Sequence, residues 1–214
     1  MKTVKLLLTA LAAFLLGVVS VSAQSAEEII SRMEAQMSGH EKDGMAMTAD
    51  TKIPILGTIK VRTYMLGDKV RMDTQMKGVK LATWEDGDTE WVYNAKNNEI
   101  EIKKATVSST DDGGDAELFN GITEGYDVSI KKETDEAWYI QCRKSKANKQ
   151  KEAPKSMDLV VAKGTFYPIS LSAKVSGIFM TMYDISFGVT EADVTFNIND
   201  FPNAKVVDKR FEKK

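Results

Sequence analysis

Residues that could carry out chemistry are few in this chain, and none stands beside an obvious partner. His40 is the only histidine and Cys142 the only cysteine among 214 residues. His40 follows a predicted helix, where we expect it to face solvent. It has no second histidine with which to form a metal site, so it is a poor candidate for a ligand or a base. Cys142 alternates with Trp138 and Ile140, which is typical of a small buried side chain rather than of a reactive thiol.

The carboxylates give no better candidate for a catalytic or metal site. Asp111, Asp112 and Asp115 lack the alternating oxygen ligands and the distal glutamate of a calcium loop, which favours a solvated loop. Glu99 and Glu101 alternate as on any wet strand face. No nucleophile elbow, zinc-protease helix or nucleotide-binding loop occurs. We therefore expect no catalytic residue, no metal and no cofactor, although an acid–base pair with members distant in sequence stays open.

The elements that surround these residues are mainly strands. Between residues 57 and 104, apolar residues recur at every second position, and turn pairs such as Gly67-Asp68 and Asp86-Gly87 separate the runs. A period of two predicts an antiparallel meander with one wet face and one face that must be covered. The apolar residues predicted to share the covered face are Ile59, Val61, Met65, Val70, Met72, Met76, Val79, Leu81, Trp91, Tyr93, Ile100 and Ile102.

Two segments could cover that face. Ser25 is a plausible N-cap for a helix that ends near Gly39, and this helix would turn its apolar side to the sheet. Residues 105–123 interrupt the strands, and Asp115 could cap a short helix over residues 116–119. The side chains predicted to form a lid over the sheet are Ile29, Ile30, Met33, Met37, Leu118 and Phe119.

Strands precede and follow the meander. Residues 45–53 read as a first strand, and alternation resumes from Tyr126 and continues to a closing run of Val194, Phe196 and Ile198. The pattern predicts about eleven strands without interleaved helices, which excludes a βαβ fold and favours one large antiparallel sheet that must curl or close. Inward methionines suit an adaptable apolar pocket, although ordinary gap-filling in a core explains them as well.

The N-terminus indicates where the protein is located, and the charge distribution limits the classes of partner that it can bind. Residues 1–23 carry lysines, an apolar run and a small-residue site before Gln24, which predicts a cleaved signal peptide rather than a retained anchor. We expect one domain over residues 24–214, exported, soluble and unlipidated. The net charge of −2 argues against nucleic-acid binding. The lysine-rich stretch Lys144–Lys155 is either a solvated loop or a docking site for an acidic partner or anionic headgroups.

Three stretches carry a resemblance to a known family. They are the opening helix from Ala26 to Met37, the hairpin from Glu85 to Asn94 with its Asp-Gly turn, Trp and Tyr-Asn, and the tail from Phe196 to Arg210 with Phe201-Pro202. Together with the order of the elements, they resemble the periplasmic outer-membrane lipoprotein carrier family (LolA-like). The resemblance covers essentially the whole chain after residue 23. It implies a mainly β fold, an incomplete antiparallel β-barrel of about eleven strands with helices covering the concave apolar face.

The resemblance also implies a function. Such a protein would be a periplasmic carrier that binds lipoprotein acyl chains, or a similar hydrophobic ligand, in an apolar cavity for transfer towards the outer membrane. We expect a monomer and a membrane-associated donor or acceptor protein as partner. One departure concerns gating: the family's pattern has an arginine near the early strand turn that ties the lid, whereas Arg62 and Arg71 are predicted here on the wet face. The alternative is a relative whose cavity is filled by its own helices, acting as a periplasmic interaction or scaffold protein; an enzyme is a distant third.

Overall fold

The computed structural model describes residues 24–40, 42–105, 119, 121–151 and 153–211. Within them the chain forms a single 12-stranded sheet in the order β12-β6-β5-β4-β3-β2-β1-β11-β10-β9-β8-β7. The strands are β1 (Met45–Ile53), β2 (Gly57–Leu66), β3 (Lys69–Met76), β4 (Val79–Glu85), β5 (Thr89–Asn94), β6 (Glu99–Lys104), β7 (Tyr126–Glu133), β8 (Ala137–Lys144), β9 (Ser156–Ala162), β10 (Pro168–Val175), β11 (Ile178–Phe187) and β12 (Lys205–Asp208). The helical elements are α2 (Ala26–Ser38), α3 (Glu191–Val194) and the 3-10 turn η2 (Ile198–Asp200).

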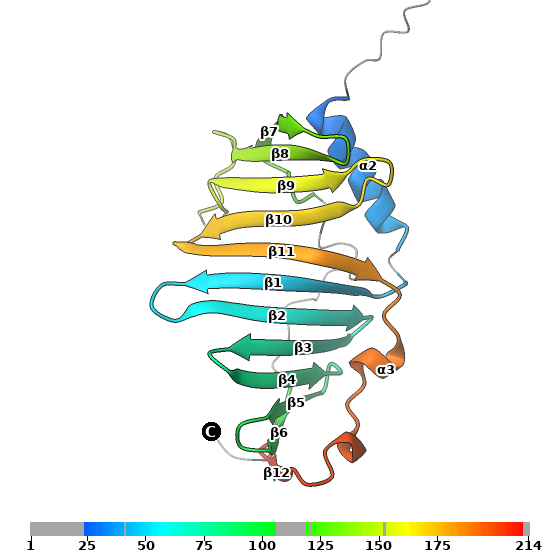
Figure 1. The fold of residues 1–214 in the computed structure, drawn as a ribbon, viewed down its shortest axis with the longest axis vertical. Helices are drawn as coiled ribbons and strands as arrows, with labels where there is room; N and C mark the ends of the chain where they lie inside the picture. The colour runs from blue at the N-terminus through cyan, green and yellow to red at the C-terminus, as the bar shows by residue number, and fades with distance from the viewer. Residues whose placement is uncertain (1–23, 41, 106–118, 120, 152, 212–214) are drawn as a thin grey trace, which may run out of the picture.

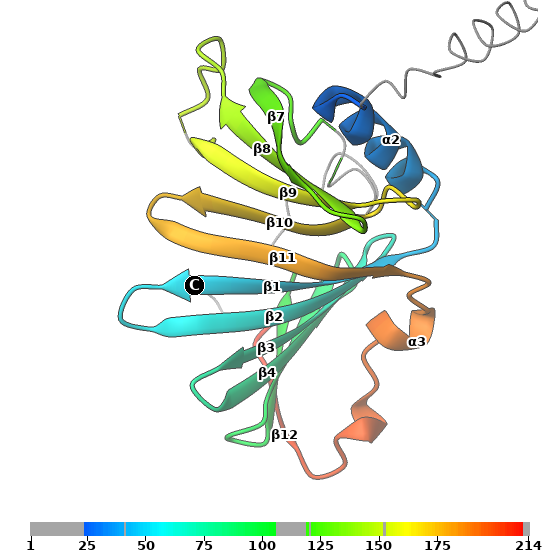
Figure 2. The same cartoon turned by 45° about the horizontal axis from the view of Figure 1, so that its top comes forward.

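The sheet consists of two meanders joined side by side. Strands β1 to β6 follow one another, as do β7 to β11, and β1 pairs antiparallel with β11 to unite them. Only β12 pairs in parallel, with β6, among the described strands. The sheet is open and curved, as Figures 1 and 2 show, and this confirms the predicted incomplete antiparallel barrel, with twelve strands in place of about eleven.

Helix α2 forms where the sequence predicts it. The Ser25 hydroxyl accepts a hydrogen bond of 3.1 Å from the backbone N–H of Glu28, and Glu27 and Glu28 lie in the positively polarised first turn. Its buried residues Ala26, Ile29, Ile30, Met33 and Met37 recur at helical spacing. After the helix, Gly44 takes a φ of +61°, and a Cβ there would lie 2.8 Å from the carbonyl oxygen of Met65. Only glycine fits at this entry to β1.

A β-bulge explains why the alternation blurs in β11. The register between β1 and β11 shifts between Ala46 and Thr48, and Asp184 on β11 has a φ of +56°. Because a bulge adds one residue to one strand, the apolar phase changes there. Ile185 and Phe187 consequently pack against the same core as Met182.

The predicted closing strand from Val194 to Ile198 is wrong. Val194 ends the short helix α3, and Ile198 begins η2. Thr190 caps α3 through a reciprocal pair of contacts with Asp193, which fixes a helical turn in a run that alternates in sequence. The last described strand is β12. The predicted signal segment 1–23 lies outside the described residues, as does the predicted helix 116–119 apart from Phe119.

Candidate ligand-binding face and its surroundings

The two faces of the sheet are covered by different parts of the chain. The helix face, defined by Met45, Met65, Leu159 and Leu171, belongs to the core on which α2 packs. The opposite face, which we call the strap face, carries Trp84 and Trp91, which pair directly between β4 and β5. The strap is residues 190–204, which run from β11 to β12 through α3 and η2. Figure 2 shows α2 beside β7 to β9 and α3 towards the other half of the sheet.

The predicted lid residues of α2 form a closed core. Ile29, Ile30, Met33 and Met37 are at most 4% exposed, and they pack with residues of β8, β9 and β10 such as Ile140, Leu159 and Leu171. Phe119, also predicted in the lid, is fully buried in the same cluster, whereas Leu118 lies outside the described residues. The helix therefore covers the β7–β10 half of the sheet and not the meander that the sequence analysis placed beneath it.

The C-terminal end of α2 is held by His40. Its ring stacks on Phe187 with centroids 4.1 Å apart, and its Nε2 lies 2.6 Å from the hydroxyl oxygen of Tyr167. Nδ1 lies 2.6 Å from a carboxylate oxygen of Asp43. This histidine is therefore half-buried rather than solvent-facing as the sequence suggested, and it ties the helix end to β11 and to the segment before β10.

The apolar row on the meander continues the helix face beyond this core. Met65 packs against the α2 core, so every second residue of β2 from Met65 lies on the helix face. The pairing register extends this face to β3 and β4: Val61 is opposite Thr74, Thr63 opposite Met72, and Thr74 opposite Leu81. The other apolar residues of β2 to β4 on this face do not belong to that core. These residues, all half-buried, are Ile59, Val61, Val70, Met72, Met76, Val79 and Leu81. We call them the apolar row.

Four of the predicted cavity residues lie on the other face, so the single-face prediction is wrong for them. Trp91 pairs with Trp84, and Tyr93 pairs with Ala82, whereas Leu81 pairs with Asn94. Ile100 and Ile102 are opposite Tyr93 and Trp91 on β6. Strand β4 carries apolar side chains on both faces. The pairing between β4 and β5 places Trp91 and Tyr93 on the same face as Trp84, whereas the prediction assumed the face of Leu81. Their neighbours on the helix face of β5 and β6 include Glu90, Glu99 and Glu101.

The strap covers these aromatic residues. Phe196 stacks on Trp91 with ring centroids 5.3 Å apart and meets Trp84 edge-on at 5.4 Å. Phe201 lies 4.5 Å from Tyr93 and 5.8 Å from Trp84, measured between centroids. Ile100 is fully buried on this side. The aromatic pairs bury large areas in favoured geometries, so this end of the strap face is a second small core.

A cleft of about 560 Å³ remains between the strap and strands β2 to β5. Trp84, Tyr93 and Phe201 form part of its lining, together with two arginines, Arg62 and Arg71. The Arg71 guanidinium lies over the rings of Tyr64 and Trp84 and donates from Nε and Nη2 to Asp73 at 3.0 and 2.9 Å. Arg71 is therefore already engaged by neighbours on the strap face.

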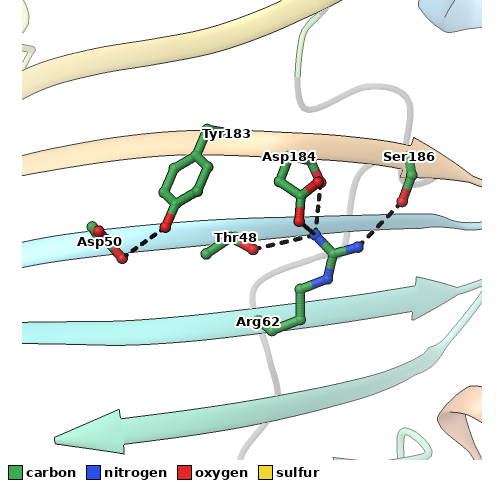
Figure 3. Close-up of polar contacts among 6 residues, drawn as sticks. All are labelled: Thr48, Asp50, Arg62, Tyr183, Asp184 and Ser186. Carbon is green, nitrogen blue, oxygen red and sulfur yellow. Dashed lines mark hydrogen bonds and ion pairs between the residues drawn. The ribbon is translucent and has the colours of Figure 1, made fainter.

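Arg62 joins three strands at the middle of the strap face (Figure 3). Its Nη1 donates to Thr48 Oγ1 at 3.2 Å, to the backbone oxygen of Asp184 at 2.6 Å and to a carboxylate oxygen of Asp184 at 2.8 Å. Nη2 donates to Ser186 Oγ at 3.2 Å. The bulge at Asp184 thus presents its backbone oxygen and a carboxylate oxygen to one guanidinium. Arg62 and Arg71 lie on the face opposite the apolar row, but this predicted wet face is partly covered, since both arginines line the cleft beneath the strap. Both cleft arginines hold the sheet together.

One acidic pair on the helix face predicts a pH dependence of stability. Glu85 lies opposite Glu90, and burial, then repulsion from Glu90 and from Asp86, raises its pKa above the ordinary value. Glu85→Gln is expected to raise the free energy of unfolding by about 0.5 kcal/mol at pH 7, because like charges across strands destabilise. A carboxyl group whose pKa is raised in the folded protein stabilises the fold at low pH, where it is protonated, and loses this contribution as the pH rises through its folded pKa. The stability gained by Glu85→Gln should therefore vanish near pH 3, where Glu85 of the wild type is uncharged. Urea unfolding at both pH values measures this, with the exposed turn variant Glu136→Gln as control; an equal gain at both would contradict it.

Reactive groups are absent from the apolar row and from the α2 core within the described residues. Cys142 is fully buried in the α2 core, and burial raises the pKa of its thiol to about 11, so the prediction of an inert, buried cysteine is confirmed. No group of three or more His, Cys, Asp or Glu side chains there is arranged to hold a metal ion. In the same residues, no helix is long and apolar enough to cross a membrane.

Comparisons with known proteins bear on the fold. A scan against family models and a search of curated proteins both find no match. Among solved structures, the lipoprotein LppX of Mycobacterium tuberculosis is 14% identical over 78% of this chain and 98% of its own, with a TM-score of 0.50. The chain shares its fold with LppX. At the level of the fold, this supports the resemblance inferred from the three sequence stretches.

Two further neighbours were found at lower structural similarity. A LolA superfamily protein from Nitrosomonas europaea is 12% identical over 81% of this chain and 99% of its own, with a TM-score of 0.32. An uncharacterized conserved protein from Thermus thermophilus is 18% identical over 86% of this chain and 99% of its own, with a TM-score of 0.44. At such identities the likeness is one of folds alone, so the ligand has to be argued from this chain's own residues.

Proposed function

We propose that the protein is an exported periplasmic carrier that binds an acyl chain, of a lipoprotein or of a similar hydrophobic ligand, along the apolar row. The observation that supports this most is the position of the row. It continues the helix face next to the α2 core, yet Val61, Met72 and Leu81 do not belong to that core. They are half-buried rather than closed over. An acyl chain laid on them would complete their burial.

The energetics suit a chain-like guest. Burying each methylene of an acyl chain contributes about 0.8 kcal/mol, so even a short stretch of contact gives useful affinity. Met72 and Met76 on the row are unbranched and polarizable, which lets one surface accept ligands of different shape. The polar residues Glu90, Glu99 and Glu101 limit the row at β5 and β6. The proposed ligand therefore lies between β2 and β4, beside the wall that α2 forms with the other half of the sheet.

The scaffold alternative has one observation in its favour. The strap face of β4 to β6 is filled by the chain's own Phe196 and Phe201, as a permanent core would be. A protein that also filled its apolar row permanently would bind no lipid and would act through partner proteins. Binding of a neutral apolar probe separates the two functions.

The test uses protein refolded from guanidinium chloride to remove bound lipid, titrated with the uncharged fluorescent probe N-phenyl-1-naphthylamine. Met72→Glu is expected to weaken probe binding at least about tenfold, because ligand binding would bury an unpaired carboxylate. Gln75→Glu is the matched control, since Gln75 lies on the same strand but on the strap face, paired with Lys60 and Lys80. It should bind the probe as the wild type does.

Each other outcome is informative. Wild-type protein that binds no probe would overturn the carrier proposal in favour of the scaffold. Loss of binding in Gln75→Glu with retention in Met72→Glu would instead locate the ligand in the strap-face cleft. Circular dichroism of both variants checks that the sheet is intact, and the partial exposure of Met72 makes a folded variant the expected result.

A further inference from the structure

One end of the sheet collects five chain connections. Those between β1 and β2, β3 and β4, β5 and β6, β8 and β9, and β10 and β11 all lie at the end where Lys52 pairs with Phe179 and Lys60 with Gln75. They form the left side of the sheet in Figure 1. We call it the lysine end. The opposite end carries the connections from β2 to β3, β4 to β5, β7 to β8 and β9 to β10.

The turn at the tip of β1 and β2 exposes apolar side chains. Ile55 is 99% exposed and Leu56 is 43% exposed. Ile55 also has a φ of +72°, a conformation that is a genuine outlier for a β-branched residue. An apolar side chain held fully in water on a strained backbone adds nothing to the fold of this chain. Such positions cluster at sites of function.

A second exposed apolar pair lies next to that turn. Phe179 and Met180 at the start of β11 are each 38% exposed, and they pair with Lys52 and Thr51 at the end of β1. The two hairpins are therefore neighbours, and each of them exposes apolar side chains. Exposed patches of this kind, rimmed by polar residues, mark interaction sites with proteins or membranes.

Charge is distributed unevenly between the two ends. The five connections at the lysine end contain six lysines, Lys77, Lys96, Lys146, Lys149, Lys151 and Lys155, against one acidic residue, Glu152. Glu124 lies nearby, just before β7. The connections at the other end contain five acidic residues, Asp68, Asp86, Asp88, Asp135 and Glu136, against one lysine, Lys163. The chain as a whole is slightly acidic, with a net charge of −2, so this is a local concentration of positive charge.

We propose that the lysine end docks on the surface of an anionic lipid bilayer. Ile55 and Leu56 enter the boundary between headgroups and acyl chains, and the lysines of the β8–β9 loop contact lipid phosphates. Neither an apolar tip nor basic loops alone would suffice, but two such signals together give stable membrane attachment. The anionic headgroups that attract the lysine end repel the acidic end, so the acidic end faces away from the membrane. This inference does not depend on where the carried ligand binds.

The choice of a membrane over an acidic protein rests on the tip. Ile55 is almost fully exposed at a hairpin apex, so no part of its own protein prevents its side chain from entering the boundary between headgroups and acyl chains. A fluid bilayer needs no preformed complement. The lysines extend on both sides of the tip along the sheet end, as expected for contact with a broad charged plane.

Flotation of the full chain without residues 1–23 on vesicles tests the proposal. We expect binding to vesicles of phosphatidylethanolamine and phosphatidylglycerol in a 3:1 ratio, weak binding to phosphatidylcholine vesicles, and release from the anionic vesicles by 0.5 M salt, which screens surface charge. Ile55→Asp should lower the partition coefficient at least about tenfold. The triple variant Lys146→Glu, Lys149→Glu and Lys151→Glu should lower it further, since each lysine near a membrane contributes about fivefold.

Matched controls make the result specific. Ile198→Asp changes an isoleucine that is 45% exposed on the strap and belongs to none of the five connections of the lysine end. The triple variant Lys104→Glu, Lys131→Glu and Lys132→Glu alters net charge equally, on exposed residues near the acidic end. Both controls should partition like the wild type. Equal loss in the charge control, equal binding to neutral vesicles, or no vesicle binding by the wild type would overturn the proposal, and retention on polyglutamate in the last case would indicate an acidic protein partner.

Discussion

Met33→Ala is expected to lower the free energy of unfolding by about 2–5 kcal/mol, the usual cost of truncating a fully buried methionine. Met33 is fully buried and lies in the cluster that α2 forms with β8 to β10, so no shift of the helix alone can refill its space. Urea unfolding followed by circular dichroism measures the loss. The prediction treats α2 as part of the permanent core of this half of the sheet.

Gln36→Ala is the control on the same helix. Gln36 is exposed, and alanine is the best helix former, so the expected change is within about 0.5 kcal/mol. If Met33→Ala were as mild as Gln36→Ala, α2 would be loosely attached. It would then be free to behave as the lid that the sequence analysis expected.

Phe196→Ala is expected to destabilise the protein by about 2–3 kcal/mol, somewhat less than a fully buried phenylalanine because Phe196 is half-buried. Phe196 is the ring that contacts Trp84, Trp91 and Phe201 together. Removing it should loosen the strap from β4 and β5. Tryptophan emission should shift to longer wavelength in the native protein, because the indole rings become more accessible to water.

Phe211→Ala provides the matched control for that variant. Phe211 is 81% exposed after β12, and its removal should change neither stability nor emission measurably. An unchanged emission spectrum in Phe196→Ala would contradict the description of the strap as the cover of the aromatic face. Ion pairs at the strap's end, such as Lys205 with Glu99 at 2.8 Å, are exposed and would not replace the lost packing.

Local signals in the sequence predicted much of the fold. The Ser25 cap, the helical spacing of Ile29, Met33 and Met37, and the period of two in residues 57–104 all act between near neighbours in the chain, so α2 and the meander follow from them. The first strand was also predicted with the bounds that β1 has, Met45–Ile53.

Which face each strand presents could not be obtained in the same way. Trp84 and Leu81 are apolar residues on opposite faces of β4. The sequence does not show which of the two shares a face with Trp91, because the pairing register between β4 and β5 determines this. The position of α2 over β7 to β10 likewise depends on the β1–β11 pairing, between residues more than 100 apart. The sequence analysis did not predict the strap, because Val194, Phe196 and Ile198 alternate as they would in a strand. The capping contacts between Thr190 and Asp193 favour a helical turn just before these residues instead.

The lysine end shows the reverse case, in which a signal was visible but not used. Residues 53–57 form an apolar turn, Ile-Pro-Ile-Leu-Gly, where turns are usually polar. The structure adds that this turn lies beside the exposed start of β11 and among lysine-rich connections.

Native mass spectrometry of the protein isolated from its own cells tests the central claim most directly. We predict that the wild type and Gln75→Glu carry an additional mass in the range of acyl-chain lipids, and that Met72→Glu, folded by circular dichroism, does not. Met72 and Gln75 are three residues apart on β3 and lie on opposite faces, so the comparison isolates the apolar row. A wild type free of lipid, or a Met72→Glu protein that retains the same mass, would contradict ligand binding at this face.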